Sequence, residues 1–385
     1  MNLRLKQFLD FYLGGFLILL LRPLVVLVGK LLRRDHEAEV RGEICVLKLL
    51  GGGSLLLAFP ALLGLRRRWP ERKLVLVCTP AVKPFAETLR IFDELILIDD
   101  SGPLRLAASA LRAWRRCLGV DTVLDLEVYS RLSTIFSALT GARNRVGFFL
   151  HEVFWRRGLH THLIFFNRFS GSWFFYERAV NLLGASPAPI EQCREHLKSG
   201  LPSPPPSSPQ GRDGETTCVG SGTSELAPER MLTAPQWEAV FMKRAGTSSG
   251  RRFVFLGAAR DRALAEATIR RLTQVLPDHR YENRCGDMNL MESLSELARA
   301  SEFWGVDSAL LHYARIFGVR CVSYWGPTDP RTRLKPVAGL EEEVEYRKIP
   351  CSPCIHLAEK APCGGNNLCI KNLFKPPSDE PEWPL

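Results

Sequence analysis

The chain has 385 residues, of which 46% are hydrophobic and 24% charged, and its formal net charge is +10 at pH 7. This length exceeds what one hydrophobic core usually organises, so we expect two domains, and the composition excludes a disordered chain. Eleven cysteines spread over such a length exclude a small secreted disulfide scaffold, and most of them are expected to be reduced core residues.

Residues 1–35 predict a membrane anchor or interfacial helix. The stretch FYLGGFLILLLRPLVVLVG at 11–29 is apolar except for Arg22, which Pro23 follows. Six basic residues and one acidic residue fall within the first 34 positions, which favours an anionic membrane surface as partner. A single transmembrane helix, a re-entrant hairpin and an interfacial helix all fit this borderline length, and a buried helical hairpin is the alternative without a membrane.

This segment also bears on processing and orientation. No small-residue cleavage site follows it, so we expect it to be kept in the mature protein. Basic residues directly after the apolar run favour a cytoplasmic position for the domain that follows.

Short apolar strands alternate with amphipathic helices over residues 40–195, the expected first domain. Strands are predicted at 43–50, 73–78, 94–99 and 121–126, and helices at 103–118 and 131–141. The second of these helices ends on a glycine that suits a C-cap. Unbroken apolar strands separated by helices are typical of a parallel sheet covered on both faces.

A polar linker over residues 196–216 precedes a second domain. It includes SGLPSPPPSSPQGRDGET, which holds almost no apolar side chain. Alternation resumes over residues 217–350, with strands at 252–257, 281–286, 302–306 and 319–326, and helices at 261–276, 290–300 and 308–318. We therefore expect an α/β protein with two doubly wound, Rossmann-like domains facing a cleft. In such sheets ligands lie beyond the carboxyl ends of the strands.

The strongest local pattern is EFWGVDSALLHYARIFGVRCVSYWGPTDP at residues 302–330. Asp307 and Ser308 follow a strand and open a helix, where backbone amides suit a phosphate, and His312 lies one turn further on. The next strand ends in GPTDP, which contains Thr328. A helix cap by Asp307, a core histidine and a turn explain each loop alone, but two such loops on adjacent strand ends favour a binding site.

This segment resembles the nucleotide-sugar-binding segment of the family 9 glycosyltransferases, the heptosyltransferases of lipopolysaccharide synthesis. Three further stretches are similar to landmarks of that family, in the same order. They are the glycine loop leading to PAL at 60–62, VDTVLDLEVYSRLSTIFSALTGARNRVGFF at 120–149, and IPCSPCIHLAEKAPCGGNNLCI at 349–370. The resemblance thus runs from about residue 43 to 373.

The resemblance implies a fold of the glycosyltransferase B type and inversion at the anomeric carbon, with no required metal or other cofactor. It places a nucleotide-sugar donor on the second domain and the acceptor on the first. Asp307, Ser308 and His312 then match donor-site positions, and Thr328 lies near the nucleotide or its diphosphate.

An inverting transfer needs a base for the acceptor's proton, and the family usually places an aspartate directly after the glycine loop. Alignment on the PAL motif puts Ser54 at that catalytic position, where a neutral serine cannot do this work and is more simply an N-cap. We name Glu127 as the substitute base, because Asp125 and Glu127 lie two apart at the carboxyl end of a predicted strand. The alternatives are a solvated loop charge for Glu127, and a helix cap or pairing with Arg131 for Asp125.

On the donor side, GSGTSELAPERMLTAPQW at 220–237 is rich in glycine and hydroxyls and contains Arg230. Backbone amides and an arginine commonly hold phosphate oxygens, whereas the alternative is a flexible loop with a solvated arginine. Gly257 ends the next strand and is expected to allow close approach of the nucleotide.

On the acceptor side, Gly52 and Gly53 shape the first loop, and residues 147–185 are both aromatic and basic. Arg156, His160 and His162 would suit a lipid-linked, anionic saccharide at a membrane surface. Packing of the first domain explains the aromatic residues equally well. No nucleic-acid recognition module is present, so nucleic acid is not an expected partner.

The C-terminal segment, residues 351–385, carries a CxxC pair and two further cysteines. These are Cys351, Cys354, Cys363 and Cys369. Four thiolates suit a structural zinc ion, but the spacing departs from that of zinc ribbons, so reduced or disulfide-linked loop cysteines are the favoured interpretation.

Together these patterns predict a membrane-associated inverting glycosyltransferase on the cytoplasmic face of the inner membrane. It would move a sugar, such as heptose from its ADP form, onto a lipid-linked envelope saccharide such as the lipopolysaccharide core. A catalytically impaired binding or scaffold protein of the same fold is the first alternative, because Ser54 replaces the expected base. A nucleotide-sugar epimerase is the second.

Overall fold

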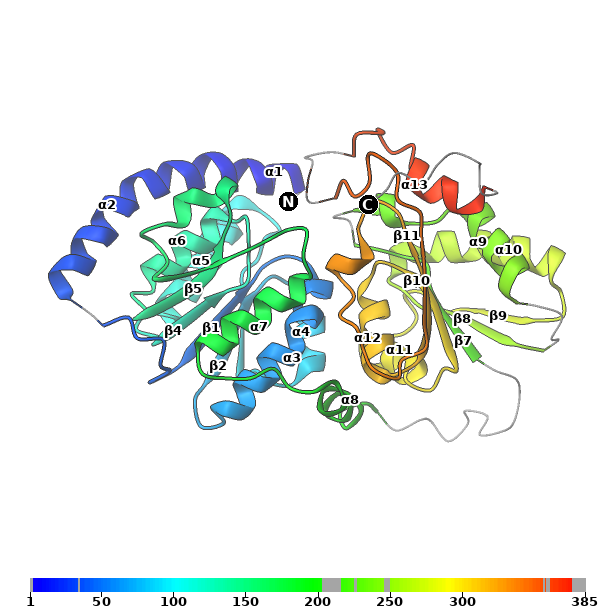
Figure 1. Cartoon of the computed structure of the whole chain (residues 1–385), viewed down its shortest axis with the longest axis horizontal. Coiled ribbons are helices and arrows are strands. Elements are labelled where there is room, and N and C mark those ends of the chain that lie inside the picture. Colours follow the sequence, from blue (N-terminus) through cyan, green and yellow to red (C-terminus); the bar gives the residue numbers. More distant parts are fainter. Residues whose placement is uncertain are drawn as a thin grey trace. The chain divides into compact units, whose positions relative to one another are not determined.

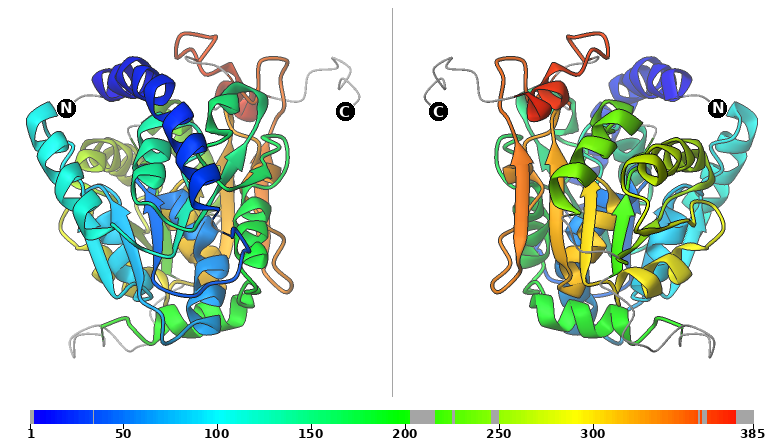
Figure 2. Two further views of the ribbon diagram at one scale, coloured as in Figure 1. Left: turned by 90° about the vertical axis from the view of Figure 1, so that its left-hand side faces the viewer. Right: turned by 90° about the vertical axis from the view of Figure 1, so that its right-hand side faces the viewer.

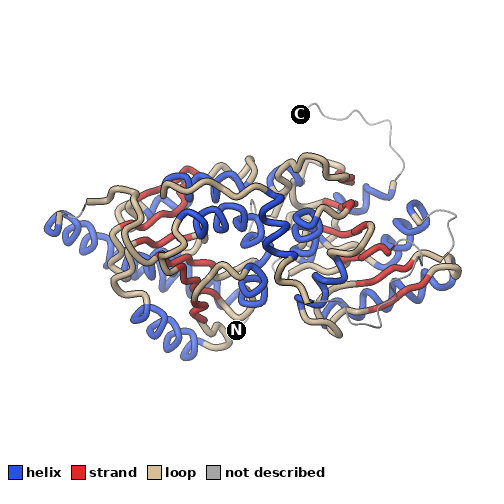
Figure 3. The backbone as a smooth tube through the Cα atoms, turned by 90° about the horizontal axis from the view of Figure 1, so that it is seen from below, coloured by secondary structure: helices blue, strands red, loops and turns tan. Residues whose placement is uncertain are grey.

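The computed structural model describes residues 3–33, 35–202, 216–224, 227–245, 250–355, 357 and 361–375. The chain divides into two compact units, Met1–Gly200 and Leu201–Leu385, and each contains one six-stranded sheet (Figures 1 and 3). All strand pairings within the two sheets are parallel. The expected α/β class with two doubly wound, Rossmann-like domains is therefore confirmed. Most of the expected linker, residues 203–215, lies outside the described residues.

The sheet of the first unit has the strand order β3-β2-β1-β4-β5-β6. Its strands are β1 (Ile44–Lys48), β2 (Leu74–Cys78), β3 (Glu94–Leu97), β4 (Thr122–Asp125), β5 (Asn144–Phe149) and β6 (His162–Phe165). Every residue of β1, β2 and β4 is buried, as expected for central strands whose two faces are both covered by helices.

Helices of the first unit follow the strands in alternation. They are α3 (Gly52–Arg68), α4 (Lys83–Leu89), α5 (Pro103–Arg116), α6 (Arg131–Leu139), the 3₁₀ helix η2 (His151–Arg156), α7 (Ser172–Leu182) and α8 (Ile190–Lys198). Cys45, Val75 and Val123 of the sheet form one apolar core with Ala113 of α5. Gly141 lies just beyond α6 with φ = +70°, so the expected C-capping glycine is confirmed.

One long helix precedes this domain. It consists of α1 (Leu3–Phe8), a π-helical turn η1 (Leu9–Leu13) and α2 (Gly14–Leu32), and it packs along α6 (Figures 1 and 2). Its length and hydropathy over Arg4–Leu32 are sufficient to cross a membrane. Only 11% of its most apolar stretch is buried, and Pro23 does not interrupt it. The alternative of a buried helical hairpin is therefore wrong.

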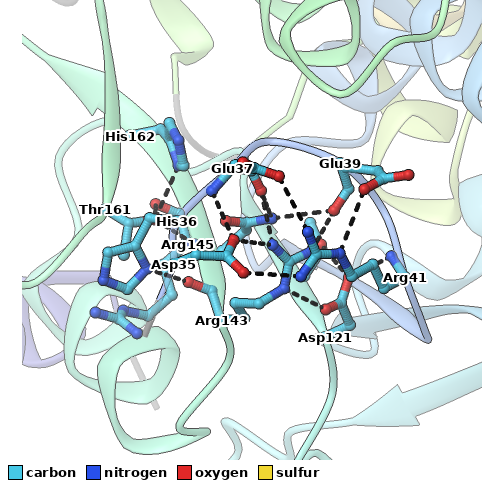
Figure 4. A network of polar contacts seen from close by, with 12 residues as sticks. Asp35, His36, Glu37, Glu39, Arg41, Asp121, Arg143, Arg145, Thr161 and His162 are labelled. Carbon is cyan, nitrogen blue, oxygen red and sulfur yellow. Dashed lines mark hydrogen bonds and ion pairs between the residues drawn. The ribbon is translucent and has the colours of Figure 1, made fainter. Parts of the chain in front are cut away.

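The segment between this helix and β1 is bound to the first unit by a polar network, shown in Figure 4. Arg143 donates through Nη1 to Oδ1 of Asp35 at 3.1 Å and to the carbonyl of Glu37 at 2.8 Å. Asp121, at the amino end of β4, accepts hydrogen bonds from the amide of Arg41 and from Nε of Arg143, both at 2.9 Å. Residues 35–41 are thus fixed against the amino ends of β4 and β5.

The second unit repeats the same topology with the order β12-β11-β10-β7-β8-β9. The strands are β7 (Thr216–Gly220), β8 (Arg252–Phe255), β9 (Arg280–Asn283), β10 (Glu302–Val306), β11 (Arg320–Trp325) and β12 (Glu342–Tyr346). The helices are η3 (Pro228–Arg230), α9 (Ala234–Arg244), η4 (Ala259–Asp261), α10 (Arg262–Val275), α11 (Leu290–Leu297), α12 (Ala309–Phe317), η5 (Pro330–Thr332), α13 (Leu368–Lys371) and η6 (Asn372–Phe374). The fully buried aromatic rings of Trp237, Phe241, Phe253 and Trp304 dominate its core.

Candidate active site

Both sheets reverse their strand order at one point, and that point locates the candidate site in each unit. In the first unit the reversal lies between β1 and β4, and in the second it lies between β7 and β10. Open parallel sheets bind ligands beyond the carboxyl ends of the strands at such switch points. The residues that follow β1, β4, β7 and β10 are therefore the candidates for contact with a ligand.

A buried ion pair links the end of β1 to the loop after β4 at the first switch point. Lys48, the last residue of β1, donates through Nζ to Oε1 of Glu127 at 2.8 Å, and the two side chains are 5% and 11% exposed. The same oxygen accepts the amides of Leu49 at 2.8 Å and Leu50 at 3.0 Å. Glu127 therefore holds the start of the glycine loop. Burial pushes the pKa of Lys48 down, but the negative charge of Glu127 outweighs it and raises that pKa above its ordinary value.

Asp125 lies beneath this pair and has different partners. Its Oδ2 is 3.3 Å from Nη2 of Arg156 and 3.3 Å from Nε2 of His160, and it accepts the hydroxyl of Ser133 at 2.9 Å. Burial tends to raise the pKa of Asp125, but Arg156 and His160 outweigh it and the pKa is lowered. Because β4 ends at Asp125, the extended alternation expected to place Asp125 and Glu127 on one side stops there.

Two of the expected acceptor residues are interior residues in this structure. The side chains of Arg156 and His160 are fully buried, and Arg156 donates through Nη2 to the carbonyls of Glu127 and Ser130. Burial lowers the pKa of His160, so its imidazole is neutral at pH 7. Both side chains thus support the loop between β4 and α6 from the interior of the first unit, and neither is exposed to solvent.

His162 is the expected acceptor residue that lies at the surface. It is half-buried at the start of β6 and lines a shallow hollow with Phe165, Phe174 and Arg178. Its Nδ1 is 2.9 Å from the hydroxyl of Thr161. Burial lowers the pKa of His162.

The glycine loop corrects the interpretation of Ser54. The N-cap of α3 is Gly51 with φ = +80°, so the helix starts at Gly52 and Ser54 lies within its first turn. The hydroxyl of Ser54 donates back to the carbonyl of Gly51 at 2.7 Å. The expected N-cap role of Ser54 is therefore wrong. Gly51 takes the N-cap position, because glycine can adopt the left-handed conformation that ends the loop.

Packing explains the first helical glycine of this loop. A Cβ at Gly52 would lie 2.2 Å from the ring of Phe85, so only glycine fits against that ring. Gly53 follows in the first turn of α3 and is half-buried. Both glycines therefore lie directly after the segment that Glu127 holds.

At the second switch point, the carboxylate of Asp307 collects the expected donor-site residues. Asp307 follows β10 and is buried, and its Oδ2 accepts Nη1 of Arg230 at 3.0 Å and the hydroxyl of Thr328 at 2.9 Å. Burial tends to raise the pKa of Asp307, but Arg230 and Arg333 outweigh it and the pKa is lowered. Residues from the loops after β7, β10 and β11 thus meet at one carboxylate.

The start of α12 leaves polar atoms available at the same place. Ser308 is the N-cap of α12, which corrects the alternative in which Asp307 caps this helix. Among the described residues, neither the buried Oγ of Ser308 nor the buried Nδ1 of His312 has a hydrogen-bond partner. Burial lowers the pKa of His312 to about 4, so the imidazole is neutral at pH 7 and can donate or accept one hydrogen bond. With Arg230 nearby, this helix start suits an anionic group such as a phosphate.

Close packing against the carboxylate of Asp261 explains why residue 257 is a glycine. A Cβ at Gly257 would lie 2.7 Å from Oδ2 of Asp261, and one at Gly222 would lie 2.2 Å from Cγ of the same carboxylate. Asp261 also accepts the amide of Ala258 at 2.9 Å. Burial raises the pKa of Asp261. The glycines after β7 and β8 therefore leave space for a buried acid, and the expected approach of a nucleotide to Gly257 stays a prediction.

The four C-terminal cysteines are free thiols, as are all cysteines of the chain. Cys354 and Cys369 are buried and Cys351 is exposed. Within the described residues, which omit 356 and 358–360, no group of three or more His, Cys, Asp or Glu side chains is arranged to hold a metal ion. The structural zinc considered from the sequence stays a prediction.

Two charged residues of these sites were not named from the sequence. Lys48 ends an otherwise apolar strand, and a lone lysine in such a run is a signal for a buried ion pair. Asp261 follows the expected strand at 252–257 and was assigned only to the helix that begins there. The partner of Lys48 lies 79 residues away, and Gly222, which leaves space for Asp261, is also distant in the sequence, so only the folded chain reveals these contacts.

Comparisons with known proteins point to one family and one fold. Residues 224–363, less than half of the chain, match the family described as glycosyltransferase family 9 (heptosyltransferase). A family 9 glycosyl transferase from Veillonella parvula superposes with a TM-score of 0.60 at 18% identity, covering 81% of this chain and 87% of that one. No curated protein sequence matches the chain.

Two Escherichia coli enzymes have similar structures. The ADP-heptose lipopolysaccharide heptosyltransferase II gives a TM-score of 0.57 at 15% identity, covering 86% of this chain and 96% of that one. The heptosyltransferase WaaC, determined with ADP, gives a TM-score of 0.58 at 16% identity, and the match covers 78% of this chain and 92% of that one. At these identities the likeness establishes the fold, which is that of the two domains of glycosyltransferase B enzymes. Residues 224–363 of the second unit are therefore similar to family 9 glycosyltransferases, and this match together with the fold supports a glycosyltransferase that uses a nucleotide sugar.

Proposed function

We propose that this protein is an inverting glycosyltransferase that transfers a sugar from a nucleotide-sugar donor to a lipid-linked saccharide of the cell envelope. The proposed donor is ADP-heptose and the proposed acceptor is the lipopolysaccharide core. The observation that carries the proposal is the cluster around Asp307, because it lies at a switch point inside the segment that matches family 9. The two E. coli structures are of an ADP-heptose heptosyltransferase and of a heptosyltransferase with ADP.

The donor is proposed to bind the second unit. Arg230 and the amides at the start of α12 would hold the diphosphate, and neutral His312 and Ser308 would offer hydrogen bonds to it. Thr328 would stay bound to Asp307 and so position that carboxylate. Positive charge and amide dipoles at this point would stabilise the leaving nucleoside diphosphate, which removes the need for a metal.

The acceptor is proposed to bind the first unit, beside the loop that starts at Leu49. Glu127 is the proposed general base, and Lys48 and the two loop amides orient its carboxylate. Gly52 and Gly53 would bring the backbone close to the acceptor. His162 would contact the saccharide at the surface, whereas Arg156 and His160 would act from the interior by positioning the loop of Glu127.

The proposed location is the cytoplasmic face of the inner membrane. It rests on the apolar N-terminal helix and on the basic residues around it. A lipid-linked acceptor would be presented at that surface.

Donor binding tests the proposal most directly. We expect ADP-heptose to raise the melting temperature of the full chain more than GDP- or UDP-sugars do. The full chain is needed because the N-terminal helix packs on α6. In Asp307→Asn the stabilisation should be lost, whereas Arg262→Met, which removes an exposed partner of Asp287, should keep it. Stabilisation by none of these nucleotide sugars would refute the donor assignment.

The base is tested with ADP-heptose and heptose-deficient lipopolysaccharide. Glu127→Gln should lower the transfer rate by about 100-fold or more while donor binding is kept. Glu152→Gln, which alters an exposed pair with Arg168, is the matched control. Unchanged turnover in Glu127→Gln would reject the base.

A binding or scaffold protein of the same fold is the second candidate. The observation that favours it is Ser54, whose hydroxyl is used within its own helix turn at the place where the family's base is expected. This candidate predicts donor binding without transfer, even with envelope membranes present. The two experiments above therefore separate it from the enzyme.

A further inference from the structure

The long N-terminal helix is bound to the first unit at its amino end. Asp10 accepts the hydroxyl of Ser130 at 2.7 Å and the amide of Leu132 at 3.0 Å through Oδ1, and the amide of Arg131 at 3.0 Å through Oδ2. It thereby caps the amino terminus of α6 from outside. Lys6 forms a further ion pair with Asp100. Asp10 is the only acidic residue in the first 34 positions of the sequence.

The middle of the helix packs closely on the same unit. A Cβ at Gly14 would lie 2.7 Å from Cβ of Arg131, so the two backbones approach at a distance that only glycine allows. Ile18 is buried in an apolar cluster with Ile135 and Trp155. The guanidinium of Arg131 lies 4.3 Å from the ring centre of Phe11, which adds a cation–π contact.

The carboxyl end is held as well, because residues 35–41 are bound to Asp121 and Arg143 (Figure 4). A helix fixed to one domain near both of its ends lies along that domain. Crossing a bilayer would remove the cap of α6 and expose the cluster around Ile18. The docked helix and a transmembrane span are therefore mutually exclusive.

Apolar side chains of this helix are exposed along its whole length, about 45 Å. The exposed apolar side chains are Leu5, Phe8, Phe11, Tyr12, Leu13, Phe16, Leu19, Leu20, Leu24, Val26, Leu27, Val28, Leu31 and Leu32. Among the described residues of the helix, the exposed charged ones are all basic: Arg4, Arg22, Lys30 and Arg33. A face that combines a continuous apolar stripe with positive charge is complementary to anionic phospholipid.

We propose that the helix over Arg4–Leu32 lies flat in the interface of an anionic phospholipid bilayer while it stays docked on α6. Its apolar face enters the acyl boundary, and its basic side chains meet the headgroups. Asp10 binds the residues that directly follow the loop of Glu127, so this loop is carried at the bilayer surface. That last consequence rests on the proposed function, whereas lipid binding by the helix does not.

Vesicle flotation of the full chain, without donor or acceptor, tests the partner. We expect binding to vesicles that contain phosphatidylglycerol and at least tenfold weaker binding to pure phosphatidylcholine. Replacing Arg22, Lys30 and Arg33 together by glutamine should weaken binding to the anionic vesicles about 100-fold. This expectation follows because each basic side chain near the surface strengthens binding about fivefold. Equal binding to both vesicle types, or no binding to the anionic ones, would overturn the proposal. Because no sugar is present, failure of the transferase assignment leaves this result unaffected.

Labelling of vesicle-bound protein tests the orientation. Gln7→Cys and Gly29→Cys place thiols near the two ends, and both positions are exposed. A membrane-impermeant maleimide added outside sealed vesicles should label both, and peptide mass spectrometry separates them from the native exposed Cys351. Labelling at one end only would indicate a span and overturn the proposal.

Docking on α6 is tested with two neighbouring glycines. Alanine gains the same helix propensity at Gly14 and Gly15, but only Gly14 meets Arg131 closely, since a Cβ at Gly15 would have its nearest neighbour at 3.9 Å. Gly14→Ala should speed hydrogen exchange at the amide of Leu132 at least tenfold, whereas Gly15→Ala should leave it unchanged. Equal exchange in both variants would overturn the docked arrangement.

Discussion

The two switch points carry the same kind of charge pair in opposite arrangements. In the first unit the cation, Lys48, belongs to a central strand, and the acid, Glu127, comes from a loop. In the second unit the acid, Asp307, directly follows a central strand, and the cation, Arg230, comes from the short helix η3. In each pair, therefore, one charged residue is at the end of a central strand, and its partner belongs to a connecting segment.

This difference predicts different roles for the two pairs. The side chains of Lys48 and Glu127 are 5% and 11% exposed, and one carboxylate oxygen already accepts three donors. The side chain of Arg230 is 14% exposed, and it donates through Nη1 to Asp307 and through Nε to the carbonyl of Ala227 at 3.3 Å. Its Nη2 makes a long contact of 3.5 Å to the hydroxyl of Ser224, so Nη2 is the group that can turn to a ligand. The first pair is therefore proposed to fix the base Glu127 in place on the acceptor side, and the second is proposed to hold the donor.

The largest expected effect is on stability. Lys48→Met leaves Glu127 as an unpaired buried charge and should cost about 3–5 kcal/mol of unfolding free energy. Arg230→Met should cost about 2 kcal/mol, because Thr328 still donates to Asp307. Urea unfolding followed by circular dichroism measures both, with Lys83→Met, from an exposed pair with Glu87, as a control near zero. A larger loss in Arg230→Met would reverse the assignment of roles.

The second effect sharpens the comparison through pH. Because burial lowers the pKa of His312 to about 4 from 6.5, the unfolded chain binds the extra proton between these values. The contribution of His312 to stability is thus complete above pH 6.5 and falls by up to about 3 kcal/mol as the pH drops to 4. In His312→Asn the loss of stability over this range should be correspondingly smaller, as measured by urea midpoints. His151→Asn is the control at an exposed position, and a slope equal to wild type in His312→Asn would contradict the buried neutral imidazole.

The smallest expected effect concerns the glycine loop. Ser54→Ala removes one hydrogen bond to Gly51 within the first turn of α3, and it should cost about 1 kcal/mol or less. Transfer should stay within about threefold of wild type, because the hydroxyl has no base beside it. A loss of 100-fold with donor binding kept would make Ser54 a catalytic residue after all.

Much of the fold follows from local patterns in the sequence. The central strands β1, β2, β4, β10 and β11 were predicted because both of their faces are covered, which makes their sequences continuous apolar runs. Strands β5 and β7 were missed, and so were the edge strands β6 and β12. The edge strands β6 and β12 are half exposed, and the sequence of β12, EEVEY, carries three glutamates, so no apolar run marks them.

The candidate site divides in the same way. Asp307, Ser308, His312 and Thr328 were named correctly as neighbours, because loops after adjacent parallel strands must meet at one sheet edge. Arg156 and His160 were expected at a surface, but aromatic and basic composition does not distinguish a membrane-facing segment from one that braces a buried aspartate.

By itself, the sequence determined the alternation of strands and helices, the two-domain organisation and the apolar, basic character of the N-terminus, because these depend on the periodicity and composition of contiguous residues. Only the tertiary structure decided that Lys48 pairs with Glu127, that Asp10 caps α6, and that the N-terminal helix lies along the first unit. Such contacts join residues 79 to 122 positions apart. They form because a polar group that loses water on burial needs a hydrogen-bond partner, and the folded chain determines which group lies within reach.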